Sequence, residues 1–234
     1  MQTSKIIRDP SRKVKEGEEP VAAPVTVYVL FMDVVGFSRL DMPAQEAVVR
    51  ALNRFVKVAK EKCWDSDKRT RHSDPRSPHS PENPLFIPTG DGMAVVFFDQ
   101  QQGDEYKQAL LWALEISALL TELKRSQPEH GFDLRMGLHV QEVQVIQDPN
   151  GRPNVAGPGI NMAQRVMDSG DAGHILGSEA YRETVRGRDA VLGRLFSEAP
   201  FTAYIKGGDD ARLYTVTQTQ GADLLGKLAP IPKV

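Results

Sequence analysis

The segment that most constrains the fold is residues 25–35, VTVYVLFMDVV, a nearly continuous run of β-branched and other apolar residues. Such a run is typical of a central strand that is buried on both faces of its sheet. It ends on one carboxylate, Asp33, and is followed by Gly36, Phe37 and Ser38. A glycine there lets the backbone approach a phosphate, and a helix start after it adds free N–H groups. We therefore expect an acid group and bare amides together at the end of a buried strand.

A second acid group has similar neighbours. In the segment FIPTGDGMAVVFF, apolar residues flank Gly90-Asp91-Gly92, which is a hairpin signal of the Asp-Gly type. This places Asp91 in a turn at the rim of a sheet. Hard cations prefer carboxylate oxygens and phosphates bind N–H donors, so the two motifs together indicate a site for magnesium ions and a triphosphate. Either motif alone would also fit an ordinary turn that contains aspartate.

Composition limits the alternatives. A chain of 234 residues with 40% hydrophobic content can bury a full core, as one domain with tails. A net charge of −2 argues against general nucleic-acid binding. The single cysteine, Cys63, excludes a disulfide framework. No apolar run is long enough to cross a bilayer, and the N-terminus has no signal-peptide pattern, so we expect a soluble, cytoplasmic protein without membrane insertion.

The chain divides into an arm, a domain and a tail. Residues 1–23 are charged and lack apolar periodicity, which indicates a flexible arm. We predict one folded domain over 24–218 and a tail over 219–234. Within the domain, prolines recur every third residue near the end of segment 65–84, which predicts a mobile insertion. A basic-loop function for Lys68, Arg69 and Arg71 is the alternative to a solvated loop.

Periodicity predicts the elements of the domain. A helix begins near Met42 with Asp41 as its N-cap, and its apolar face is Val48, Leu52, Phe55 and Val58 or Ala59. A long helix over about 104–126 carries Leu110, Leu114, Ser117, Leu120 and Leu123 on one face.

The rest of the chain completes an α+β pattern. Alternation over 132–146 predicts a half-buried strand. A helix at 160–173, a short strand at 174–178, a Ser-capped helix at 178–187 and a hairpin at 201–217 follow. The order β-α-β-β-α-β-α-β-α-β-β resembles an extended ferredoxin-like split βαβ core, with a mainly antiparallel sheet flanked by helices.

A polar helix start carries further candidate chemistry. In NVAGPGINMAQR, Asn161 and Arg165 are four residues apart and project from one helix face. The carboxamide can fix a sugar oxygen and the guanidinium can fork onto phosphate oxygens, although both also fit a simple surface helix. Arg135 and His139 share a strand face with Gly137, and a structural role is favoured for the histidine. Lys206, at a strand end, is either a phosphate contact or an ordinary hairpin residue.

Five motifs in this order resemble the catalytic domain of class III nucleotidyl cyclases. They are FMDVVGFSRL, TGDGMAVVF, LRMGLHV, GPGINMAQR and the closing IKG with LYTV, over about residues 25–217. The resemblance implies two divalent ions, Mg²⁺ or Mn²⁺, and a head-to-tail homodimer with two shared sites. It assigns Asp33, Val34 and Asp91 to the metals, Asn161 to the ribose, and Arg135, Arg165 and Lys206 to the phosphates, with Asn161 and Arg165 as the catalytic pair.

The chain departs from this family at the positions that read the base. Adenylate cyclases of the class usually have a lysine four residues before the second metal aspartate, where this chain has Ile87, and Asp or Thr where it has Asn154. Ile87 cannot bond to a purine nitrogen, whereas Asn154 can donate and accept at the edge of uracil or cytosine. The chain thus resembles the bacterial pyrimidine cyclases of antiphage signalling, which implies UTP as substrate and a separate cyclic-nucleotide effector. An adenylate cyclase with unconventional base contacts and a non-catalytic nucleotide-binding module are the alternatives.

Overall fold

The computed structural model describes residues 23–64, 84–100, 103–205 and 209–217. Their strands form one eight-stranded sheet in the order β2-β3-β1-β4-β6-β8-β7, with β5 paired to β4. Only the β4–β6 pair is parallel among these strands. The strands are β1 (Val25–Val34), β2 (Leu85–Pro88), β3 (Gly92–Phe98), β4 (Leu134–Gln147), β5 (Pro153–Ala156), β6 (Ile175–Ser178), β7 (Phe201–Ile205) and β8 (Asp209–Thr215).

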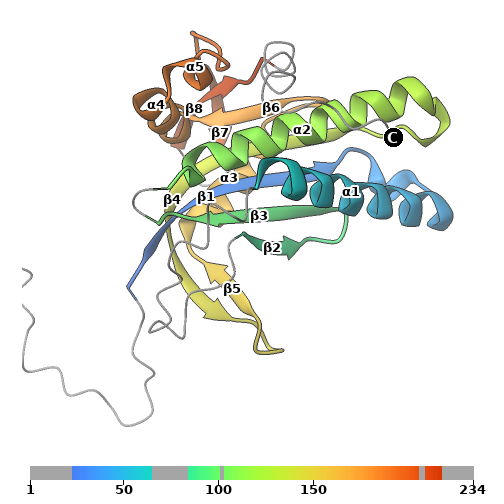
Figure 1. Cartoon of the computed structure of the whole chain (residues 1–234), viewed down its shortest axis with the longest axis horizontal. Coiled ribbons are helices and arrows are strands. Elements are labelled where there is room, and N and C mark those ends of the chain that lie inside the picture. Colours follow the sequence, from blue (N-terminus) through green and yellow to red (C-terminus); the bar gives the residue numbers. More distant parts are fainter. Residues whose placement is uncertain (1–22, 65–83, 101–102, 206–208, 218–234) are drawn as a thin grey trace, which may run out of the picture.

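Helices cover both faces of the sheet. In Figure 1, α1 and α2 lie side by side along one face. The helix α3 packs against β4 and β1 on the other. The helices are α1 (Met42–Cys63), α2 (Glu105–Ser126), α3 (Pro158–Asp168), α4 (Glu179–Arg188) and α5 (Ala190–Gly193), with 3₁₀ turns at Phe37–Arg39 and Pro128–His130.

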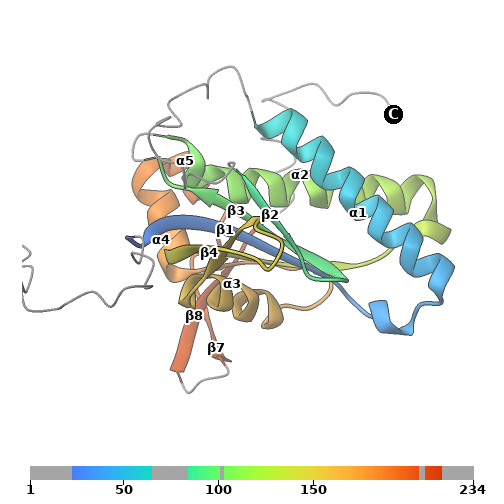
Figure 2. The same cartoon turned by 90° about the horizontal axis from the view of Figure 1, so that it is seen from below.

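The expected ferredoxin-like core is confirmed. The segment β1-α1-β2-β3-α2-β4 gives the strand order β2-β3-β1-β4, in which the first strand lies between the third and the fourth of the unit. β4 then continues past its partner β1 and pairs with β5, in a hairpin that extends away from α1 and α2 (Figure 1). The β7–β8 hairpin projects from another part of the body (Figure 2). The predicted α+β class with a mainly antiparallel sheet is therefore correct.

The alternation of β1 divides the core into two layers. Tyr28, Leu30, Met32 and Val34 pack into the main cluster with α1 and α2. The residues between them, Val27, Val29 and Phe31, join a smaller cluster under α3 and β5. Since side chains alternate along a strand, the next residue on the α3 side is Asp33. The buried strand therefore delivers its one charged residue to the face that α3 covers.

The two long helices lie close to their predicted positions. Asp41 caps α1, since its Oδ1 accepts from the N–H of Ala44 at 2.9 Å, and Ala59 rather than Val58 completes the buried face. α2 is buried more widely than the predicted stripe, and Trp112 is fully inside. The first half of α2 is buried on more than one side because the sheet, α1 and α4 all cover it, which a single apolar stripe does not predict.

Two local predictions need correction. The four residues of β5 belong to the motif around Asn154, and we had predicted no strand there, since so short a segment shows no alternation. The turn around Asp91 has its left-handed glycine before the aspartate, at Gly90 (φ 95°), rather than after it at Gly92. Glycine as the first of two central residues is the preference of type II′ hairpins, which suit the twist of paired strands.

A close approach fixes α3 on the sheet. Gly137 of β4 lies directly beneath this helix, and a Cβ added there would come within 2.5 Å of the backbone N of Met167 and 2.6 Å of the carbonyl O of Ala163. A glycine inside a strand often marks such a contact. Among the described helices, none combines the length and apolarity that crossing a membrane requires.

Candidate active site

The two predicted metal carboxylates lie together at one end of β1. Asp33 is paired with Gly92 of β3, so the preceding residue, Asp91, stands beside it in the β2–β3 turn. The N–H of Val34 donates to the carbonyl O of Asp91 at 3.1 Å and ties the turn to the strand. Gly92 is required there, because a Cβ would lie 2.2 Å from the carbonyl O of Met32. The strand pairing therefore brings together two acids that are 58 residues apart in the sequence.

The Asp33 carboxylate is paired with Arg135. The two residues are opposite each other in the β1–β4 register. Nε and Nη2 of Arg135 both donate to Oδ2 of Asp33, at 3.1 and 2.9 Å. The same Nη2 lies 3.1 Å from Oδ1 of Asp168 at the end of α3. The predicted phosphate ligand is thus held beside the metal ligands by two carboxylates.

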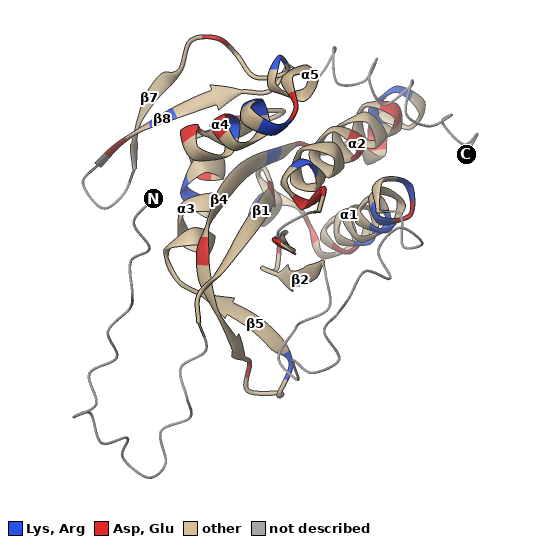
Figure 3. Ribbon diagram, turned by 60° about the vertical axis from the view of Figure 1, so that its left-hand side comes forward, with Lys and Arg blue, Asp and Glu red and all other residues tan. Residues whose placement is uncertain are grey.

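The surroundings of Asp33 set its electrostatics. Its side chain is 17% exposed, and β1, β2 and β3 carry no other charged residue. Figure 3 shows most of the charged residues on the helices instead. Burial raises the pKa of the Asp33 carboxyl above its ordinary value, the hydrogen bond from Arg135 opposes this, and the charge of Asp91 adds to it. A second cation near this carboxylate would stabilise its ionised form.

The loop after β1 has the features of a phosphate-binding turn. Gly36 adopts φ 75° and opens the 3₁₀ turn. The N–H groups of Gly36, Phe37 and Ser38 donate to no backbone carbonyl of a described residue. The side-chain amide of Gln45 holds the loop in place, since its Nε2 donates to the carbonyls of Phe37 and Leu40 at 3.3 and 3.1 Å. Sequence reasoning did not identify Gln45, because the bond depends on how α1 begins.

The donor set suits a magnesium or manganese ion that is completed by a substrate. Among the described residues, no group of three side chains of the metal-ligating types gathers at one point. Mg²⁺ characteristically takes one or two carboxylates and fills its remaining positions with water and phosphate oxygens. Asp33 and Asp91 could supply these carboxylates, and the backbone of Val34 adjoins both. The residues present therefore fit the implied ions.

The predicted pair on α3 is exposed to ligands. Asn161 is exposed and Arg165 is half-buried, and neither side chain forms a hydrogen bond or an ion pair with another described residue. Positions i, i+4 and i+7 share a helix face, so Asp168 lies on the same face. Seven residues of helix separate Asn161 from Asp168 by about 10 Å. Asn161 therefore lies at the opposite end of α3 from Asp168, and so away from the Asp33 carboxylate of its own chain.

The two base-reading candidates lie on strands that contact each other, β2 and β5. Ile87 of β2 and Val155 of β5 pack against the same smaller cluster under α3. Asn154 precedes Val155, and its Oδ1 accepts from the Val155 N–H at 2.8 Å. This bond leaves the amide NH₂ of Asn154 as the group that can donate to a ligand. Because side chains alternate along a strand, Asn154 points to the face of β5 opposite to the one that Val155 and Ile87 share.

Two further candidate residues remain, Lys206 and His139. Lys206 lies outside the described residues. His139 is buried, with Nδ1 2.8 Å from Oγ of Ser178 and Nε2 3.0 Å from Oε1 of Gln141. Because Oε1 can only accept, Nε2 carries the proton and Nδ1 accepts from Ser178, and burial lowers the histidine pKa. These bonds support the structural role expected for His139.

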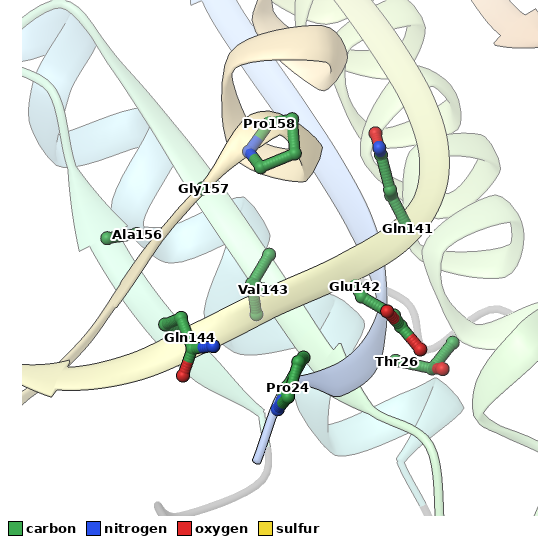
Figure 4. Close-up of a pocket in the computed structure, with 9 residues that line it drawn as sticks. All are labelled: Pro24, Thr26, Gln141, Glu142, Val143, Gln144, Ala156, Gly157 and Pro158. Carbon is green, nitrogen blue, oxygen red and sulfur yellow. The ribbon is translucent and has the colours of Figure 1, made fainter. Parts of the chain in front are cut away.

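A shallow hollow lies at the other end of the sheet. It measures about 540 Å³ and lies between the start of β1, the middle of β4 and the β5–α3 junction (Figure 4). Its rim has one carboxylate and no Lys or Arg, a composition that disfavours a triphosphate. The lining residues are Pro24, Thr26, Gln141, Glu142, Val143, Gln144, Ala156, Gly157 and Pro158, none of which is a predicted site residue.

Known proteins of similar architecture are found among solved structures. No protein-family model and no curated protein sequence matches the chain. Solved structures do. The adenylyl cyclase CyaB from P. aeruginosa has a TM-score of 0.63 at 18% identity, over 83% of this chain and 94% of that one.

Two further structures are similar to the chain. The guanylate cyclase domain of RhGC from Catenaria anguillulae, in complex with GTP, has a TM-score of 0.61 at 22% identity, over 84% and 98% of the two chains. An adenylate cyclase from Trypanosoma brucei has 0.57 at 14%, over 82% and 87%. At these identities the likeness concerns the fold. The chain has the fold of class III nucleotidyl cyclase catalytic domains.

Proposed function

We propose that this protein is a nucleotidyl cyclase, which converts a nucleoside triphosphate to its 3′,5′-cyclic monophosphate and pyrophosphate. The ribose 3′-oxygen forms a bond to the α-phosphorus and loses its proton. The bond from the α-phosphorus to the bridging oxygen breaks, and pyrophosphate leaves. The observation that carries the proposal is the pairing of Asp33 and Asp91 by the Val34 bond, with Arg135 beside them, in a chain of cyclase fold.

The residues divide the work by charge. Asp33 and Asp91 would hold two divalent ions, which, when bound, activate the attacking oxygen and stabilise the leaving one. Arg135 would bind the leaving phosphates from its position beside Asp33. The N–H groups of Gly36, Phe37 and Ser38 would donate hydrogen bonds to phosphate oxygens. Lys206 is part of the proposed phosphate set through the family resemblance alone.

We propose that two copies of the chain share each site. Asn161 and Arg165 have no hydrogen-bond or ion-pair partners among the described residues, whereas Asp33 and Arg135 are paired with each other. In a head-to-tail homodimer, Asn161 of one protomer would orient the ribose and Arg165 would bind the phosphates over the metals of its partner. Each copy would thus supply half of two equivalent sites.

We propose UTP as the preferred substrate. The apolar Ile87 would leave a purine nitrogen unpaired, while the NH₂ of Asn154, whose Oδ1 accepts from the Val155 N–H, can donate to a uracil carbonyl. The resemblance to bacterial pyrimidine cyclases extends this to a role in antiphage second-messenger signalling through a separate effector. The domain would cover residues 24–218, with residues 1–23 and 219–234 as appendages.

The test is a product assay. Purified protein is incubated with equal amounts of all four ribonucleoside triphosphates and Mn²⁺, and the products are separated by chromatography. We expect cyclic UMP as the main product. Cyclic AMP as the main product would keep the cyclase and overturn the pyrimidine preference, and the absence of any cyclic product would favour a non-catalytic nucleotide-binding module.

The Asn154→Ala variant sharpens the base assignment. Since its NH₂ would serve to discriminate between bases, the variant should lose preference for UTP over ATP more than it loses turnover. The matched control is Asn150→Ala, in the exposed turn between β4 and β5. An unchanged product ratio in Asn154→Ala would remove Asn154 from base selection.

A further inference from the structure

Arg135 is shared between two acids that belong to different layers of the molecule. It forms two hydrogen bonds with Asp33 on the neighbouring strand. It also pairs with Asp168, whose side chain is 47% exposed, on the last turn of α3. The close contact at Gly137 sets this helix over β4 and so places Asp168 beside the guanidinium. The bridge therefore depends on both the sheet register and the helix position.

Asp168 is poorly placed for the stability of its own helix. The carboxyl end of a helix carries a partial negative charge, which makes an acidic side chain there unfavourable. Its negative charge also raises the pKa of the Asp33 carboxyl. In the described part of the chain, Asp168 does not form a group of three metal-ligating side chains with Asp33 and Asp91. Among the described residues, the ion-pair partner of Asp168 is Arg135.

We propose that Asp168 is a positioning residue that takes over Arg135 when a divalent ion binds Asp33. A dication on the Asp33 carboxylate repels the guanidinium that now donates twice to Oδ2. Asp168 already lies 3.1 Å from Nη2, so the arginine can leave Asp33 without losing its counter-charge or leaving the site. This inference rests on the proposed function, because it assumes that Asp33 binds a metal.

The proposal predicts a specific pattern of metal affinity. Without Asp168 the guanidinium has only Asp33 as partner, so the ion must displace it at a greater cost. Asp168→Asn should weaken Mn²⁺ binding about two- to five-fold, the range expected for a partly exposed ion pair. Arg135→Gln should tighten Mn²⁺ binding, since it removes the competitor. In the Arg135→Gln background, Asp168→Asn should lose its specific effect.

The experiment is a titration with Mn²⁺ alone, without nucleotide. Free Mn²⁺ is measured by electron paramagnetic resonance on EDTA-treated, full-length protein, and circular dichroism checks that each variant is folded. The set comprises wild type, Asp33→Ala and Arg135→Gln, with Asp168→Asn and Asp171→Asn each made in both the wild-type and the Arg135→Gln backgrounds. Asp171→Asn is the control, because Asp171 is an exposed acid just beyond α3, so the variant removes the same charge without touching Arg135.

The outcomes separate the inference from the proposed function. The expected result is that Asp168→Asn weakens binding more than Asp171→Asn in the wild-type background, and equally in the Arg135→Gln background. Equal weakening by Asp168→Asn in both backgrounds would overturn the inference, because Asp168 would then act independently of Arg135. If Asp33→Ala leaves Mn²⁺ binding unchanged, the metal assignment itself fails. An Arg135→Met background repeats the comparison if Arg135→Gln does not fold.

Discussion

The two faces of the sheet differ in what they bury. The face under α1 and α2 is closed by the main cluster, which includes Trp112, Phe97 and Phe55. The face under α3 has a smaller cluster, and its row of apolar side chains on β1 ends at Asp33, beside Arg135 and Asp168. One strand thus serves both purposes through its alternation. The difference teaches that the stabilising layer and the candidate site can be changed separately.

The largest expected effect is on activity. Asp33→Ala or Asp91→Ala should reduce cyclic nucleotide formation by several orders of magnitude, because a metal ligand contributes several kcal/mol to the transition state. Neither residue belongs to a buried apolar cluster, so thermal unfolding should change little. Product formation and the melting temperature are measured together. Near-normal turnover in either variant would exclude the two-metal assignment.

A change on the opposite face should reverse this pattern. Leu30 is fully buried in the main cluster, and Leu30→Ala should lower the free energy of unfolding by about 2–5 kcal/mol. The folded fraction at low temperature should keep most of its activity, since Leu30 points away from Asp33. Urea unfolding measures the stability, and activity per folded molecule measures the site. A loss of activity as large as that of Asp33→Ala would show that the two faces are not separable.

Gly137 contributes to both stability and the candidate site, because it allows α3 to pack closely on the sheet. Gly137→Ala would force the helix backbone away, at a cost of about 1–3 kcal/mol, and would shift Asn161 and Arg165 with it. The matched control is Gly187→Ala in α4, where an added Cβ meets nothing within 4 Å and stability should stay the same or rise. We expect reduced stability and reduced activity for Gly137→Ala alone. Equal behaviour of the two variants would contradict the close packing.

The smallest effect concerns pH. His139 is buried and neutral, with its pKa lowered, so only the unfolded chain takes up a proton as the pH falls below about 6.5. The contribution of His139 to the free energy of unfolding should therefore be fully present above that pH. Below it, the contribution should fall by at most about 1.4 kcal/mol per pH unit until the folded-state pKa is reached. In His139→Gln this contribution should vanish from the slope measured by urea unfolding between pH 7 and 5. An identical slope in both proteins would show that His139 does not stay neutral.

The features of the fold and of the candidate site that depend on neighbouring residues could be predicted from the sequence. The apolar run of β1, the Asp41 cap and the hairpin around Asp91 follow from neighbouring residues, and all three are present. The contact between Asp168 and Arg135 could not be predicted, because it joins residues 33 positions apart through the packing of a helix on a strand. The one available signal was Gly137, whose position inside a strand marks close backbone approach.

The central proposal is that Asp33 and Asp91 of one protomer and Asn161 and Arg165 of the other form the two halves of one shared site. Equal amounts of Asp33→Ala and Asn161→Ala protein, each inactive alone, are mixed under conditions in which subunits exchange, and cyclic nucleotide formation is measured. Half of the dimers are then mixed and hold one intact site of two, so activity should return to about a quarter of the wild-type value. If exchange is verified by mass and no activity returns, the two halves do not meet across a dimer.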